Sequence, residues 1–213
     1  GIDVIDVVAS PIAASFVTLS KPQKIAGCVL VNIGAETLSI VVFENNIPIS
    51  IEVFPIGSAD ITNDIALGLK VALEEAETIK LGGLTHSSYP RKKLEEIISA
   101  RLGDMFEFIE NHLKKIGKNG LLPAGIILTG GGSYINSIED MARQALHLPS
   151  RVASLKIGDG KIQVKDSSWS VAYGLCIMGT IPEEEERLGL HGQNSALTNT
   201  FNKIWDWLKQ FLP

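Results

Sequence analysis

Three apolar stretches near the start of the chain predict neighbouring β-strands. Residues 27–34 form an almost uninterrupted apolar run, which is typical of a central strand covered on both faces. Two further runs follow at residues 38–43 and 47–54, and Asn45 and Asn46 between them favour a tight hairpin turn. We therefore expect an antiparallel meander of three strands.

Helical patterns occupy much of the rest of the chain. The clearest covers residues 92–118, where apolar side chains recur every three or four positions. A fourth strand at residues 125–129 runs into a row of glycines, and a short strand follows near Val152. The predicted helices cover residues 10–19, 62–69, 72–81, 92–118, 136–146 and 168–178. This order of strands and helices predicts a mixed α/β sheet flanked by helices.

The chain changes character at Pro182. Residues 182–195 are rich in Glu and Gly with little to bury, which predicts a flexible acidic linker. From 196 to 213, apolar residues recur at helical spacing, which predicts an amphipathic helix lying in a membrane surface; docking on its own domain or on a partner is the alternative. The apolar, membrane-binding face comprises Leu197, Phe201, Ile204, Trp205, Leu208, Phe211 and Leu212.

Composition and charge exclude several classes of function. The 213 residues have a formal net charge of −5, which argues against a general nucleic-acid binder. No apolar stretch reaches the roughly 20 residues that span a bilayer, and the two cysteines and four histidines lack zinc-like spacing. Walker-type loops, G-x-S-x-G elbows and G-x-G-x-x-G fingerprints are absent. The start at Gly1, without a signal-peptide pattern, is typical of the middle of a longer protein.

Three segments combine residue types that suit a nucleotide, although each has an ordinary explanation. The turn at residues 32–37 directs backbone N–H groups and the Thr37 hydroxyl outward, as phosphate oxygens require, but a plain hairpin turn is the alternative. The glycines at residues 130–132 let a backbone approach a ligand closely before a helix begins. Glu77 and Lys80 lie on one predicted helix face, which could equally be a solvated charged face.

The order of these segments resembles the second half of the FtsA family, the bacterial cell-division members of the actin-like ATPase superfamily. The resemblance runs from Val4 to the C-terminal helix and rests on LVNIGAETLSIVVFENN, PIGSADITNDIALGLKVALEEAETIK, GIILTGGGSYI and VAYGLCIMG. It implies an α/β fold similar to the ribonuclease-H-like half of actin. Residues 1–58 and 119–181 would form the core subdomain, and residues 59–118 a small, mostly helical insertion subdomain.

The resemblance also implies a cleft for ATP and Mg²⁺. The nucleotide-binding residues that it implies are Asn32, Gly34, Ala35, Glu36 and Thr37 beside the phosphates, Glu77 and Lys80 beside the ribose and base, and Gly130, Gly131 and Gly132 beside the adenosine, with Gly57 as a weaker candidate. The superfamily usually has Asp where Asn32 stands, and a neutral amide cannot anchor hydrated Mg²⁺ or accept a proton as a carboxylate does. We therefore expect ATP binding with weak or no ATPase activity.

The function that the resemblance implies is a cell-division scaffold. ATP-bound protomers would polymerise, bind the C-terminal tail of FtsZ, tether the FtsZ ring to the cytoplasmic face of the bacterial cell membrane at the division site, and recruit other division proteins. Candidate contacts for the acidic FtsZ tail are Arg91, Lys92, Lys93 and Arg101. Two alternatives stay open: an FtsA-like type IV pilus assembly protein, and an active ATPase or sugar kinase of the same superfamily.

Overall fold

The computed structural model describes residues 4, 6–84, 88–157, 162–164 and 166–180. The chain divides into two compact units, Gly1–Leu175 and Cys176–Pro213, and of the second unit only residues 176–180 are described. The predicted linker at 182–195 and the predicted amphipathic helix at 196–213 lie outside the described residues. The predicted division of the first unit into a core and a helical insertion stays a prediction.

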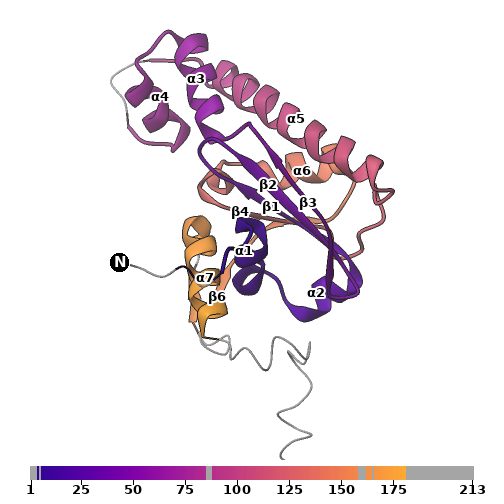
Figure 1. Ribbon diagram of the computed structural model, residues 1–213. Coiled ribbons are helices and arrows are strands. Elements are labelled where there is room, and N and C mark those ends of the chain that lie inside the picture. Colours follow the sequence, from indigo (N-terminus) through magenta and orange to yellow (C-terminus); the bar gives the residue numbers. More distant parts are fainter. Residues whose placement is uncertain (1–3, 5, 85–87, 158–161, 165, 181–213) are drawn as a thin grey trace, which may run out of the picture. The chain divides into compact units, whose positions relative to one another are not determined.

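A five-stranded mixed sheet forms the centre of the first unit, in the order β3–β2–β1–β4–β5 (Figure 1). The strands β1 (Cys28–Ile33), β2 (Leu38–Glu44) and β3 (Ile47–Phe54) pair antiparallel, which confirms the predicted meander. The strands β4 (Ile126–Thr129) and β5 (Ser150–Val152) continue the sheet on the other side of β1, and both pairings there are parallel. The strand β1 is therefore central, as its apolar run predicts.

Helices lie at both faces of the sheet. They are α1 (Ser10–Thr18), α2 (Lys21–Ala26), α3 (Ser58–Leu69), α4 (Leu73–Lys80), α5 (Arg91–Lys115), α6 (Ile138–Leu146) and α7 (Ser170–Gly179), with short 3₁₀ turns η1 (Gly131–Tyr134) and η2 (Ser167–Trp169). Figure 1 shows the long α5 beside the meander, with α3 and α4 near its N-terminal end. None of the helices in the described ranges is long and apolar enough to cross a bilayer.

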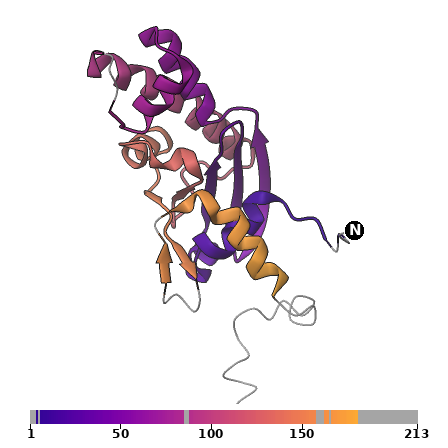
Figure 2. The same cartoon turned by 90° about the vertical axis from the view of Figure 1, so that its left-hand side faces the viewer.

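The sequence pattern does not predict two of these elements. The helix α2 is only six residues long and mostly polar, and it begins at a capping box formed by Ser20 and Gln23. The hairpin of β6 (Leu155–Ile157) and β7 (Ile162–Val164) forms a separate two-stranded sheet, visible as two orange arrows in Figure 2. Both elements are shorter than the window over which hydrophobic periodicity is informative.

Two apolar layers hold the sheet between its helices. Because successive side chains of a strand point to opposite faces, β1 contributes Val29 and Val31 to the layer under α3, α4, α5 and α6. It contributes Cys28 and Leu30 to the layer under α1, where Val171 of α7 also packs. Burial raises the pKa of the Cys28 thiol to about 11, so that this thiol stays protonated and unreactive. The core therefore fixes the C-terminal ends of β1 and β4, where the candidate site lies.

Candidate functional site

The turn between β1 and β2 presents backbone donors that no protein group uses. The N–H groups of Ser58 and Ala59, in the first turn of α3, donate to the carbonyl oxygens of Gly34 and Ala35 at 2.9 and 2.8 Å. Both carbonyls are thereby bound to α3. Across the described part of the chain, the N–H groups of Ala35 and Glu36 donate to no protein acceptor. Exposed N–H donors of this kind suit an anion such as a phosphate.

Gly57 allows this contact between α3 and the turn. A Cβ atom at Gly57 would lie 2.2 Å from the carbonyl oxygen of Ala35 and 2.6 Å from the backbone nitrogen of Glu36. Its N–H group donates to Asp60 at 2.8 Å, which completes the start of the helix. The weaker candidate of the sequence analysis is therefore a packing residue that positions the turn.

The three glycines after β4 have different surroundings. Gly130 has a φ of +87°, and a Cβ there would lie 2.4 Å from the Oδ1 atom of Asn32, while a Cβ at Gly132 would lie 2.4 Å from Cγ2 of Ile33. Gly131 is exposed, and a Cβ there would meet only the hydroxyl of Ser168, at 3.8 Å. Two glycines thus press the turn onto the end of β1, and the third has open space for a ligand beside it.

The sequence pattern predicts that the glycine run leads directly into the N-terminus of a helix, and this prediction is wrong. The run enters η1, and α6 begins only at Ile138, because Ser137 adopts a left-handed conformation before the helix. The carbonyl oxygen of Gly130 accepts a hydrogen bond from the hydroxyl of Ser133 at 2.7 Å, and that hydroxyl lies 3.0 Å from the hydroxyl of Ser167. The sequence analysis did not identify Ser133, which directly follows the glycine run, or Ser167, which begins the serine-rich stretch at residues 167–170.

Glu77 and Lys80 form a partly buried ion pair at the end of α4. The Nζ atom of Lys80 lies 2.7 Å from Oε2 of Glu77, and the Lys80 side chain is only 5% exposed, against 45% for Glu77. Lys80 also donates to the Thr62 hydroxyl at 2.8 Å and to the Ser58 carbonyl at 3.1 Å. These three contacts use all three protons of the ammonium group. Lys80 is therefore a positioning residue rather than part of a solvated face.

The electrostatics of this pair leave Glu77 as an acceptor. Burial alone would raise the pKa of Glu77, but hydrogen bonds from Lys80 and from Thr62, the latter at 2.5 Å, hold that pKa below its ordinary value. The half-exposed carboxylate stays ionised at neutral pH. It can accept a hydrogen bond from a ligand hydroxyl.

The three candidate segments join in one network. Lys80 binds the Ser58 carbonyl, the Ser58 N–H binds the turn at Gly34, and Gly130 packs against Asn32 of β1. Lys80 also lines a groove of about 750 Å³ together with Ile135, between α4, α5 and the connection from η1 to α6. The structure thus brings the predicted residues to one region. The turn at residues 34–37 and the glycines at 130–132 do not line that groove.

Metal-binding groups are sparse in this region. Over the ranges that the structure describes, no three His, Cys, Asp or Glu side chains are arranged to hold a metal ion. The turn offers the exposed carboxylate of Glu36 and the neutral amide of Asn32. The backbone donors fit a phosphate group well, whereas the single carboxylate would repel a phosphate unless a Mg²⁺ ion, itself bound to that phosphate, lay between them.

Solved structures with the same fold are actin-like proteins. The chain superposes on the PilM–PilN type IV pilus biogenesis complex with a TM-score of 0.64 at 19% identity, covering 84% of this chain and 54% of that chain. It superposes on MreB5 of Spiroplasma citri bound to AMPPNP with a TM-score of 0.64 at 13% identity, covering 86% and 61%. At these identities the likeness shows the fold alone. The predicted actin-like α/β fold is confirmed.

Sequence relatives identify the family. The chain is 30% identical over 196 residues to cell division protein FtsA of Bacillus subtilis, covering 82% of this chain and 43% of that protein. It is 30% identical over 235 residues to FtsA of Borreliella burgdorferi, covering 98% and 55%. The chain spans about half the length of these curated relatives. The sequence profile described as cell division protein FtsA matches residues 29–174. The chain therefore belongs to the FtsA family of actin-like cell-division proteins.

Proposed function

We propose that this chain forms one half of the nucleotide cleft of an FtsA-type scaffold. The scaffold binds ATP with Mg²⁺, polymerises, tethers an FtsZ ring to the cytoplasmic face of the bacterial cell membrane at the division site, and recruits further division proteins. The observation that carries the proposal is the network that joins the turn at residues 34–37, the Glu77–Lys80 pair and Gly130. Each of the three segments could by itself be a plain turn or a solvated helix face. Those explanations do not account for the contacts that join the three segments.

Each segment has a task in this proposal. The N–H groups of Ala35 and Glu36 and the Thr37 hydroxyl bind phosphate oxygens, with Glu36 also available to a Mg²⁺-bound water. The exposed backbone of Gly131 lies against the adenosine, and the carboxylate of Glu77 accepts a hydrogen bond from a ribose hydroxyl. Lys80 holds Glu77 in place. Mg²⁺ would supply charge neutralisation at the phosphates.

Weak or absent hydrolysis follows from the donor set. Asn32 stands at the end of β1 beside Gly130, where its amide has no acid–base function at neutral pH. Glu36 restores one negative charge at another backbone position. The proposed activity is therefore nucleotide-dependent assembly rather than turnover.

Gly131 gives the sharpest test of nucleotide binding. A Gly131→Leu side chain enters open space beside the proposed adenosine, so it should lower ATP affinity at least tenfold without lowering the free energy of unfolding. Gly103→Leu is the matched control, because a Cβ at Gly103, on α5, meets no atom within 4 Å, and the one contact of a Cβ at Gly131 is at 3.8 Å. Both variants are made in the full-length protein and titrated with labelled ATP. Equal affinities for the two variants would refute the proposed site.

The FtsZ tail would bind at the start of α5. Arg91, Lys92 and Lys93 are exposed there, and opposite charge would attract an acidic tail. Arg101 is committed elsewhere, since its guanidinium binds Asp64 in two hydrogen bonds of 2.6 and 3.0 Å. Charge reversal at Arg91 and Lys93 should weaken tail binding, measured by anisotropy of a labelled FtsZ tail peptide.

Arg143 on α6 supplies the control for that experiment. It is exposed on another helix, and its ion pair among the described residues is with Asp140 of its own helix, at 3.0 Å. Reversal of its charge changes the net charge of the chain without changing the start of α5. If Arg143→Glu lowers the affinity for the tail peptide as much, for each charge reversed, as the α5 variants do, net charge explains the effect. The proposed binding site at the start of α5 would then be wrong.

The pilus alternative rests on the likeness to PilM, which is one of fold. The FtsA profile and the FtsA relatives favour the division role. The proposed membrane contact comes from the apolar face of residues 196–213, and its test is given below.

A further inference from the structure

Within the described ranges, the strand β3 is an edge of the main sheet and has an apolar face that no described element covers. Among the described strands it pairs only with β2, so one side of its backbone faces away from the sheet. Ile49, Ile51 and Val53 alternate along it and are 42%, 43% and 52% exposed. Three large apolar side chains in a row on an open edge are unusual on a monomer surface, which seldom exposes contiguous apolar area without a partner.

The open part of β3 is limited to its second half. Pro48 lacks an N–H group, and the pairing with β2 shifts register between Val42 and Phe43. Both features disfavour strand addition near the hairpin tip. From Ser50 to Phe54 the register is regular, and this stretch includes the exposed Ile51 and Val53, whereas Ile49 is the extra residue at the register shift and has no partner on β2.

We propose that β3 pairs with β3 of a second copy of this chain, antiparallel, about a two-fold axis at Ile51. The two five-stranded sheets then become one continuous sheet. The contact needs no nucleotide, and it is therefore independent of the proposed function. It relates the two copies by a closed two-fold axis, whereas head-to-tail polymerisation uses two different surfaces.

The register follows from the order of residues in the strand. With the axis at Ile51, Ile51 meets its own equivalent and Ser50 lies opposite the partner's Glu52, while Ile49, at the register shift, comes beside the partner's Val53. The apolar residues of both copies then gather on one side of the sheet. An axis at Glu52 would place two glutamates opposite each other, which is destabilising. The sequence of β3 is thus self-complementary in one register.

Charges on α5 favour the same arrangement. Phe108 stacks on Phe54 at 5.4 Å and His112 hydrogen-bonds Ser50 at 2.8 Å, so α5 runs antiparallel to β3 above its other face. A two-fold axis that inverts β3 therefore also inverts α5. The exposed carboxylate of Glu107 in one copy is then directed toward the exposed Lys115 near the end of the partner's α5.

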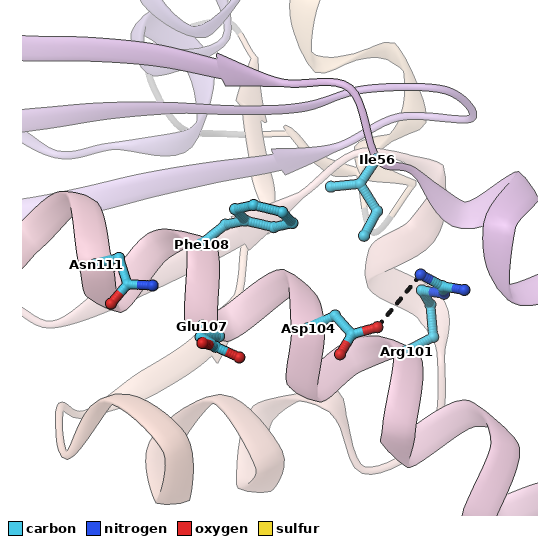
Figure 3. A pocket seen from close by; sticks show the side chains of 6 residues that line it. All are labelled: Ile56, Arg101, Asp104, Glu107, Phe108 and Asn111. Atoms are coloured by element: carbon cyan, nitrogen blue, oxygen red, sulfur yellow. Dashed lines mark hydrogen bonds and ion pairs between the residues drawn. The ribbon is translucent and has the colours of Figure 1, made fainter.

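A groove beside the edge gives the partner's α5 room. It has a volume of about 270 Å³ and is lined by Ile56, Arg101, Asp104, Glu107, Phe108 and Asn111. In Figure 3, Phe108 points toward the strands, and the carboxylates of Asp104 and Glu107 lie along α5. Arg101 pairs with Asp104 in this groove at 3.2 Å, so that the exposed carboxylate of Glu107 is the group complementary in charge to Lys115 at the end of the partner's α5.

Disulfide cross-linking tests the axis directly. In the full chain with Cys176→Ser, an Ile51→Cys substitution places two thiols across the axis, and mild oxidation should give a covalent dimer. Cys28 is buried and stays in place. Leu67→Cys is the control, because Leu67 is 78% exposed on α3. Equal dimer yields at positions 51 and 67 would overturn the proposal.

Equilibrium self-association tests the face and the charges. Sedimentation without nucleotide should show a monomer–dimer equilibrium whose dissociation constant rises at least tenfold for Val53→Asp and is unchanged for Leu67→Asp. Glu107→Lys and Lys115→Glu should each weaken the dimer, and the double variant should restore it. If the chain is a monomer at all accessible concentrations, the partner of this face is an extended segment of another protein instead of a second copy. If Val53→Asp abolishes binding to liposomes, this face binds lipid. Either outcome overturns the proposal.

Discussion

At the scale of single residues, identical amino acids have different tasks in this site. Gly130 and Gly132 are required by packing, because a side chain at either would collide with Asn32 or Ile33, whereas Gly131 could carry a side chain without disturbing the fold. The sequence analysis names Lys80 as a ligand contact, but the protons of its ammonium group are all donated to acceptors within the protein. Only the three-dimensional environment separates the groups that build the site from those that meet a ligand.

The amide of Asn32 makes a first prediction. Replacing Asn32 with Asp in the full-length protein should raise the rate of ATP turnover, because a carboxylate at the end of β1 can hold hydrated Mg²⁺ and accept a proton. Phosphate release is measured with and without Mg²⁺. Asn111→Asp, on the exposed surface of α5, controls for added charge. A fast wild-type rate would contradict the scaffold role itself, and no gain in Asn32→Asp would show that the turn has also diverged.

His112 makes the stability of the chain depend on pH. Its side chain is buried, and burial lowers its pKa below 6.5; Glu52, at 3.5 Å, acts to raise that pKa, and Lys115 lowers it. Because the folded pKa is depressed, the neutral form stabilises the fold fully above pH 6.5, and this contribution is lost as pH falls below that value. The free energy of unfolding, measured in urea at pH 7.5 and 5.5, should therefore fall less in His112→Gln than in the parent. Equal falls would contradict this.

At the scale of elements, the strands follow from the sequence more closely than the helix ends do. The run at residues 27–34 predicts β1 because burial on both faces leaves an unmistakable apolar signature. The helix α3 starts four residues before the predicted helix. Its first residues, Ser58, Ala59 and Asp60, serve in capping and in the contact with the turn, and neither role produces a periodic pattern of apolar residues in the sequence. The convergence of α3 with α4 at Lys80 depends on tertiary contacts that the sequence does not display.

The segment at residues 196–213 makes a prediction at this scale. Trp205→Glu and deletion of residues 196–213 should each sharply reduce co-sedimentation of the chain with liposomes, because the apolar face would lose the burial that binds it to the membrane surface. Trp205→Phe is the control, as it keeps an apolar aromatic side chain. If the deleted chain pellets as well as the parent, this segment is not the anchor.

At the scale of the whole molecule, the proposed function makes this chain one wall of a cleft. The chain spans about half the length of its FtsA relatives, and the turn and the glycines that we propose as nucleotide contacts both lie on it. The 213-residue chain alone should therefore bind ATP at least tenfold more weakly than the full-length protein, a loss of at least about 1.4 kcal/mol. Titration of both with labelled ATP measures the difference. Equal affinities would contradict a cleft closed by two halves.

The central place of β1 has a consequence for synthesis on the ribosome. The strands β1, β2 and β3 can pair as soon as they emerge, but β4, which covers the other edge of β1, begins roughly ninety residues after the end of β1. At about 5–20 residues per second, a nascent chain displays that edge and its apolar side chains for on the order of 5–20 s. A translating ribosome thus carries an unfinished sheet on which a chaperone, or the same edge of a neighbouring nascent chain, can act before β4 arrives.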